Sequence, residues 1–139
     1  MVLLDSNVVL DIATRDPVWS EWSLAMREAA RLEGVAAISE IAFAEVSVRY
    51  NQREEVDELM TLLDLEIAPM PRDALFLAAK AFQRYRRAGG TKMGVPPDFF
   101  IGAQAAVLGV PLITRDPRRY RTYFATIELV TPEPGNRLS

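Results

Sequence analysis

The sequence predicts an α/β fold, a sandwich of helices around a mainly parallel sheet. Short apolar runs of strand length alternate with longer amphipathic segments along the chain, which is the order that parallel strands joined by crossover helices require. Half of the 139 residues are hydrophobic, and no linker, repeat or low-complexity stretch divides them. We therefore expect one core and one domain, residues 1–139.

Five apolar runs have the length and the flanking residues of strands. They are residues 2–4, 35–38, 66–68, 112–114 and 127–130, the last expected at an edge of the sheet. Because the carboxyl ends of parallel strands meet along one edge, polar residues that directly follow these strands are expected to share a cleft.

Caps, prolines and glycines set the bounds of the expected helices. A short helix follows the first strand and is capped by Ser6 or Asn7, and Ser39 is expected to cap the helix after the second strand. The remaining bounds come from Pro17, Pro71 and the glycines at 34, 89 and 109. The expected helices are residues 8–12, 17–33, 40–50, 56–63, 71–88, 98–108 and 117–120.

The chain contains no histidine and no cysteine. This excludes Ser-His and Cys-His catalysis and every zinc site built on imidazole or thiolate. A hydrolase with this composition must use carboxylates, and the fitting helper is a hard cation such as Mg²⁺ or Mn²⁺. The apolar runs are shorter than a membrane span and the N-terminus does not resemble a signal peptide. With no cysteine to form disulfides, we expect a cytoplasmic protein.

Charge is unevenly distributed along the chain. The formal net charge is −3, yet residues 80–121 carry nine basic residues and only two acids, Asp98 and Asp116, for a segment charge of +7. The rest of the chain therefore carries −10. A basic segment that encloses two acids is typical of a phosphate-binding site with embedded metal ligands. The alternative is that Arg84, Arg86 and Arg87 only solvate a helix face.

Four carboxylates occupy positions that place them at the same edge of the predicted sheet. Asp5 and Asp116 follow strands, Asp98 opens a helix, and Glu45 lies among apolar neighbours in the helix after the second strand. Two carboxylates about 4 Å apart repel by roughly 4 kcal/mol at an effective dielectric of about 20. A divalent cation removes this cost and also activates water and a phosphoryl group, so clustered acids indicate a metal site.

Each acid also has a purely structural interpretation. Asp5, Asp98 and Asp116 are all at positions where an aspartate commonly caps a helix or a turn. Glu45 has Arg49 four residues later, a spacing that allows an ion pair on the helix surface.

Taken together, the sequences around the four acids resemble the motifs of PIN-domain nucleases. The matching stretches are Leu-Leu-Asp5-Ser-Asn7, Ser39 through Ala-Glu45-Val, Asp98-Phe-Phe-Ile-Gly-Ala-Gln-Ala, and Leu-Ile-Thr114-Arg-Asp116 with Tyr120 at a usual aromatic position. Each motif is weak alone, but the order and spacing cover the whole chain. The size resembles that of the VapC-type toxins of toxin–antitoxin pairs.

The resemblance implies a three-layer α/β/α sandwich and hydrolysis of RNA phosphodiesters with Mg²⁺ or Mn²⁺. It also implies a homodimer and inhibition by a cognate antitoxin protein. Carried over by position, the metal ligands and catalytic residues are Asp5, Glu45, Asp98 and Asp116, with Asn7 and Thr114 as supporting polar groups. We further expect Lys92, Arg115 and Arg119 to contact RNA phosphates.

The sequence departs from the family pattern at several positions. Some members carry one more acid before the aromatic, where this chain has Arg118 and Arg119, which argues against a second tightly bound metal. Gly102 replaces a usual alanine, at a cost to the helix of about 1 kcal/mol. Asp11, although frequent in the family pattern, is interpreted as structural.

Two other hypotheses remain open at this stage. The fold can serve as a catalytically silent module that only binds RNA or a partner protein, its acids neutralised by Lys92 or Arg115. Phosphatases of the haloacid-dehalogenase type also begin with an apolar run and an aspartate, but they require a second aspartate two residues later, where this chain has Asn7.

Overall fold

A computed structural model describes residues 1–132, so residues 133–139 of the expected domain lie outside the described residues. Its five strands are all parallel, in the order β3-β2-β1-β4-β5. The strands are β1 (Val2–Leu4), β2 (Ala36–Ser39), β3 (Glu66–Ala68), β4 (Leu112–Ile113) and β5 (Leu129–Val130). The predicted α/β class with a parallel sheet is confirmed.

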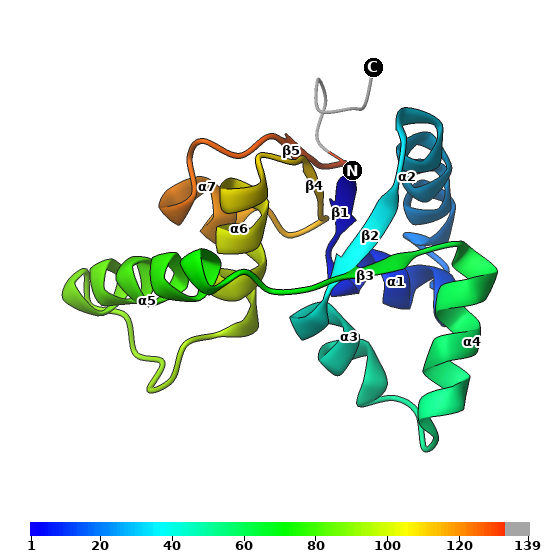
Figure 1. Ribbon diagram of the computed structural model, residues 1–139, viewed down its shortest axis with the longest axis horizontal. Helices are drawn as coiled ribbons and strands as arrows, with labels where there is room; N and C mark the ends of the chain where they lie inside the picture. Colours follow the sequence, from blue (N-terminus) through cyan, green and yellow to red (C-terminus); the bar gives the residue numbers. More distant parts are fainter. Residues whose placement is uncertain (133–139) are drawn as a thin grey trace.

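Helices cover both faces of this sheet. They are α1 (Ser6–Ala13), α2 (Ser20–Glu33), α3 (Glu40–Ser47), α4 (Arg53–Leu63), α5 (Arg72–Arg87), α6 (Pro97–Leu108) and α7 (Arg118–Tyr123). Helices α1, α2 and α4 lie on one side of the strands, and α5, α6 and α7 lie on the other (Figure 1). The arrangement is the expected three-layer sandwich.

The central strand β1 sets the position of the functional edge. It pairs with β2 on one side and with β4 on the other, and Leu3 and Leu4 are completely buried. Strands covered on both faces are apolar throughout, which explains the uninterrupted Val-Leu-Leu run. The chain leaves β1 towards β2 and later returns to its other side as β4. Ligands bind at such a switch point, outside the carboxyl ends of the strands.

Several helix ends differ from the prediction, each for a local reason. Asp5, not Ser6 or Asn7, is the N-cap of α1, and its carboxylate accepts a hydrogen bond from the Ser6 N–H. Helix α2 begins at Ser20 instead of Pro17, because the Asp16 carboxylate accepts the N–H groups of Val18 and Trp19 in a turn. Side chains of this kind compete with helix formation.

The helix after β2 is shorter than predicted but starts where expected. Ser39 caps α3 by accepting the Ile41 N–H, which confirms that prediction, while the helix ends at Ser47 instead of near residue 50. Within residues 1–132, no helix is both long enough and apolar enough to cross a membrane.

Candidate metal centre

An open pocket of about 430 Å³ lies at the carboxyl edge of the sheet. All four predicted acids line it: Asp5, Glu45, Asp98 and Asp116. Three basic residues, Lys92, Arg118 and Arg119, line the same pocket. The fold therefore brings acids from four separate segments of the chain together with the basic groups of the positively charged segment.

Asp5 is the most enclosed of the four acids, with 6% of its surface exposed. Its Oδ1 accepts the Ser6 N–H at 2.8 Å, and its Oδ2 accepts the hydroxyls of Thr114 at 2.9 Å and Tyr120 at 2.8 Å. Burial raises the pKa of Asp5, although these three hydrogen bonds oppose the shift. The carboxylate is thus fixed in orientation, and none of these three partners carries a positive charge.

Tyr120 has a role that the sequence did not reveal. The sequence placed it only as an aromatic residue, but its hydroxyl donates to Asp5 from 115 positions away. Burial and the nearby carboxylates raise the pKa of Tyr120 well above 10.0, so the phenol stays protonated and remains a donor. Gly102 makes room mainly for the Phe124 ring and also for that of Tyr120, since a Cβ there would lie 2.6 Å from Phe124 and 3.0 Å from Tyr120. The departure from alanine therefore has a packing reason.

Thr114 and Asn7, predicted as supporting groups, connect two of the acids. The Thr114 hydroxyl donates to Asp5 and accepts the Asp116 N–H at 3.1 Å. Asn7 donates to the same hydroxyl at 3.3 Å and accepts the Arg115 N–H at 3.4 Å. Both residues hold the loop after β4 against the start of α1.

Glu45 projects from α3 and is half-buried. Burial raises the pKa of its carboxyl, and the charges of Asp5 and Asp98 raise it further, whereas a hydrogen bond with the Ser6 side chain lowers it. Within residues 1–132, Glu45 forms no salt bridge, so the alternative pairing with Arg49 does not occur. The Ser6 contact was not anticipated from the sequence, which carries no local signal for it.

Asp98 and Asp116 are not the helix caps that the alternative interpretations proposed. Pro96 is the N-cap of α6, and Asp98 lies in the first turn with its Oδ1 3.1 Å from Arg119 Nη1. Pro117 is the N-cap of α7, with no side-chain hydrogen bond, and Asp116 is exposed at the pocket. Neither carboxylate caps a helix; Asp98 is paired with Arg119, and Asp116 is exposed at the pocket.

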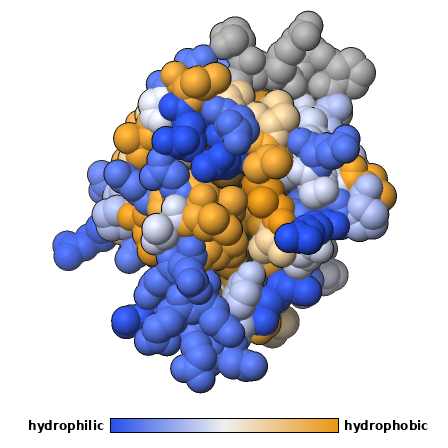
Figure 2. Space-filling model, turned by 90° about the vertical axis from the view of Figure 1, so that its right-hand side faces the viewer, coloured by the Kyte–Doolittle hydropathy of each residue, from blue (hydrophilic) through white to orange (hydrophobic). Residues whose placement is uncertain are grey.

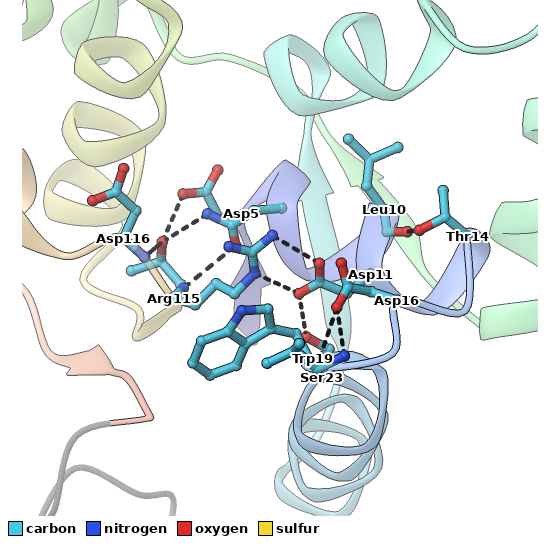
Figure 3. Close-up of polar contacts among 12 residues, drawn as sticks. Asp5, Leu10, Asp11, Thr14, Asp16, Trp19, Ser23, Arg115 and Asp116 are labelled. Atoms are coloured by element: carbon cyan, nitrogen blue, oxygen red, sulfur yellow. Dashed lines mark hydrogen bonds and ion pairs between the residues drawn. The ribbon is translucent and has the colours of Figure 1, made fainter.

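Arg115, which was expected to contact RNA phosphates, is paired with an acid outside the pocket. Its Nε and Nη2 donate to the two oxygens of Asp11, at 2.7 and 2.9 Å, and its guanidinium lies over the Trp19 ring (Figure 3). The side chain extends from the loop that carries Asp116 towards Asp11, and Arg115 is not among the residues that line the pocket. Asp11 also accepts the Ser23 hydroxyl at 2.8 Å, which agrees with its structural interpretation.

The donor set of the pocket fits a hard divalent cation, since it offers four carboxylates and no nitrogen or sulfur ligand. Within residues 1–132, however, no three acids lie close enough to hold one ion in their present positions. One Asp98 oxygen is paired with Arg119.

Comparison with known proteins gives one family match and several structural matches. A family model described as the PIN domain matches residues 2–125. VapBC2 from Rickettsia felis, bound to a DNA fragment from its promoter, is 18% identical, with a TM-score of 0.67 over 94% of this chain and 98% of that chain. VapBC-1 from nontypeable Haemophilus influenzae is 15% identical, with a TM-score of 0.66 over the same shares of the two chains.

A toxin–antitoxin complex from Klebsiella pneumoniae is 24% identical, with a TM-score of 0.58 over 96% of this chain and 98% of that chain. At these identities the structural matches establish the fold. No curated protein sequence matches significantly.

Proposed function

The chain belongs to the PIN domain family, and we propose that it is a metal-dependent endoribonuclease, the toxin of a toxin–antitoxin pair. One observation carries the proposal: four acids from separate segments, Asp5, Glu45, Asp98 and Asp116, line one open pocket. We assign them as the ligands of Mg²⁺ or Mn²⁺ and as the catalytic residues. Keeping uncompensated acids together costs stability, so a cation is the simplest reason for the arrangement.

The residues of the pocket have different roles in the proposed hydrolysis. A bound Mg²⁺ or Mn²⁺ supplies Lewis-acid activation of water and offsets charge on the phosphoryl group. Asp5 presents a carboxylate held in one orientation by Thr114 and Tyr120. Glu45, half-buried on α3 and lining the same pocket, would offer the ion a further carboxylate from another segment of the chain.

Lys92 and Arg119 supply positive charge for the flanking RNA phosphates. We leave Arg115 out of this role, because its guanidinium donors face Asp11. Asn7 and Thr114 keep the supporting role assigned to them, since their hydrogen bonds fix the segments that bear Asp5 and Asp116.

A cognate antitoxin is the protein partner that we propose. The similar structures are VapBC and other toxin–antitoxin complexes. On the face that carries α2 and α4, hydrophobic side chains gather in a strip between hydrophilic regions (Figure 2). Exposed apolar residues of these two helices are Leu24, Leu32 and Leu62. A surface of this kind suits the apolar face of a partner helix.

We also propose a cytoplasmic homodimer. Large aromatic residues are candidates for a dimer face: Trp22 and Phe82 pack partly buried against the core, whereas Phe76 on α5 is 65% exposed and follows Leu75, which is 42% exposed. We place the dimer face on α5. Sedimentation of the purified chain with and without Phe76→Glu tests this, and a dimer that persists in the variant contradicts a dimer face on α5.

A silent binding module is the second candidate, and one observation favours it. The Arg119–Asp98 ion pair already neutralises one of the four acids, although by a different residue from the Lys92 or Arg115 that the sequence suggested. The two candidates differ in activity. A silent module binds RNA without cleaving it at any Mn²⁺ concentration.

The test is cleavage of a panel of fluorescently labelled RNAs by the full chain, with Mg²⁺ or Mn²⁺ and with EDTA. We expect Asp5→Asn and Asp98→Asn to abolish cleavage while circular dichroism shows a folded protein. Asp73→Asn, the same change at an exposed residue in the first turn of α5, is the matched control and keeps full activity. Native rates in either pocket variant would contradict the assignment.

A further inference from the structure

Arg119 occupies a distinctive position in the pocket. It stands in the first turn of α7, where its Nη1 lies 3.1 Å from Asp98 Oδ1. Its guanidinium carbon lies 5.4 Å from the ring centre of Tyr85 and 5.5 Å from that of Phe99. The side chains of Arg119 and Asp98 are 31% and 30% exposed. The arginine is thus held by one ion pair and two aromatic rings.

The two kinds of contact respond differently to a cation. A divalent ion bound by Asp98 withdraws the carboxylate from the arginine, because two positive charges compete for the same oxygens. The rings of Tyr85 and Phe99 are neutral and attract the guanidinium whether or not Asp98 is engaged. Arg119 therefore remains at the wall of the pocket after the ion pair is broken, with its donors free.

We propose that Arg119 and the divalent cation compete for Asp98, and that the arginine released by the ion binds an RNA phosphate. This rests on the proposed nuclease function and deepens it: metal and RNA then bind cooperatively. By linkage, RNA that engages Arg119 also strengthens metal binding by the same factor. A pocket in which Arg119 is paired with Asp98 therefore binds the ion less tightly than a pocket in which Arg119 is bound to RNA.

The loop that carries Lys92 is tied to the same aromatic support. The Tyr85 hydroxyl accepts the N–H groups of Thr91 and Lys92, both at 3.1 Å. One ring thus supports Arg119 and anchors the segment that bears the other proposed phosphate ligand. The same tyrosine therefore supports both basic residues, and both line the pocket.

Calorimetric titration of the full chain with Mn²⁺, in the absence of RNA, tests the competition. Arg119→Gln is expected to bind Mn²⁺ about fivefold more tightly than the wild type, the scale that a partly exposed ion pair allows. Arg119→Lys keeps the charge and stays near the wild-type Kd. Arg118→Gln is the matched control, since it removes the same charge from an exposed residue of the same pocket. It is expected to change the Kd by less than about twofold.

A second measurement distinguishes the release of Arg119 towards RNA from a general effect of removing one positive charge from the pocket. At saturating Mn²⁺, Arg119→Gln is expected to raise the KM for a labelled RNA several-fold, with Arg119→Lys partly restoring it. Melting in EDTA checks the fold of each variant. If Arg119→Gln does not fold, Arg119→Met, which keeps apolar contact with Tyr85 and Phe99, replaces it in both measurements.

Three results would overturn the proposal. The first is an unchanged Mn²⁺ Kd in Arg119→Gln, the second is weaker Mn²⁺ binding in Arg119→Gln than in the wild type, and the third is an equally large decrease of the Kd in Arg118→Gln. The first and third exclude a specific competition, and the second makes Arg119 a fixed support of Asp98. Any of these in a protein that binds Mn²⁺ and cleaves RNA overturns the coupling and leaves the nuclease function intact. A wild-type chain that neither binds Mn²⁺ nor cleaves RNA overturns both.

Discussion

Two buried acids of this protein, Asp5 and Asp11, are separated by a few residues of sequence but differ in the charge of their hydrogen-bond partners. Asp11 is 2% exposed and is fully partnered by the guanidinium of Arg115 and the hydroxyl of Ser23. Asp5 is almost as buried, yet its partners are hydroxyls and a backbone N–H, and none of them is positively charged.

The difference distinguishes a structural carboxylate from a candidate ligand. Burial of a charge is costly unless an opposite charge compensates it. Asp11 receives that compensation from within the chain. At the pocket the pKa values of Asp5 and Glu45 are raised by burial, so the compensation there is incomplete. A cation from solution can supply the missing positive charge at the pocket. Variants that remove one negative charge should therefore lower the stability at Asp11 and raise it at the pocket.

The largest effect is expected at Asp11. Asp11→Asn removes the charge that faces Arg115 and should lower the free energy of unfolding by about 2 kcal/mol. This is below the cost of a fully buried pair, because 30% of the Arg115 side chain is exposed. Chemical denaturation at neutral pH in EDTA measures it.

Asp57→Asn is the matched control for this prediction. Asp57 also pairs with an arginine, Arg53, at 3.2 Å, but both side chains are largely exposed. Its loss should cost no more than a few tenths of a kcal/mol. Equal effects of the two substitutions would show that the buried pair with Arg115 contributes nothing beyond a surface pair.

A smaller effect is expected from the cation itself. Mn²⁺ at about ten times its Kd should stabilise the wild-type chain by about 1.4 kcal/mol, as mass action requires of a ligand that binds only the folded state. Asp98→Asn should lose most of this gain, whereas Asp11→Asn, although less stable, should keep it. A thermal melt series in Mn²⁺ decides the matter, and a gain that survives in Asp98→Asn would place the ion elsewhere.

The positions of the strands and of most helices could be predicted because they depend on local signals, and the meeting of the four acids was expected from the parallel sheet and the family resemblance. Apolar runs mark strands, and parallel strands bring their carboxyl ends together, so Asp5 and Asp116 were expected at one edge of the sheet. Ser39 was recognisable as a cap from its position alone. Helix α2 was placed too early, because the sequence does not show that the Asp16 side chain takes two N–H groups from the backbone.

The partners of charged and polar side chains could not be predicted in the same way. Arg115 was expected at RNA phosphates and lies on Asp11, 104 positions away, while Tyr120 was expected only as an aromatic and bonds to Asp5. Both contacts depend on how α1, α2 and α7 pack around the sheet. The roles of the four acids as metal ligands stay a proposal that the variants above examine.

The smallest predicted effect lies at Glu45 and has the opposite sign to that at Asp11. Because the folded pKa of Glu45 is raised above the ordinary 4.5, ionisation is less favourable in the fold than in the unfolded chain. Its contribution to stability is present below about pH 4.5 and is lost as the pH rises through the raised pKa. A glutamine in place of Glu45 would carry no charge and would still accept a hydrogen bond from Ser6.

In EDTA at neutral pH, Glu45→Gln should therefore melt a few degrees above the wild type, and the two melting temperatures should converge as the pH falls to about 4. Saturating Mn²⁺ should reverse the order, since only the wild type offers the fourth carboxylate. A variant that melts below the wild type in EDTA would mean that the pocket compensates its acids from within, as Arg115 does for Asp11. The contrast between the two regions would then fail.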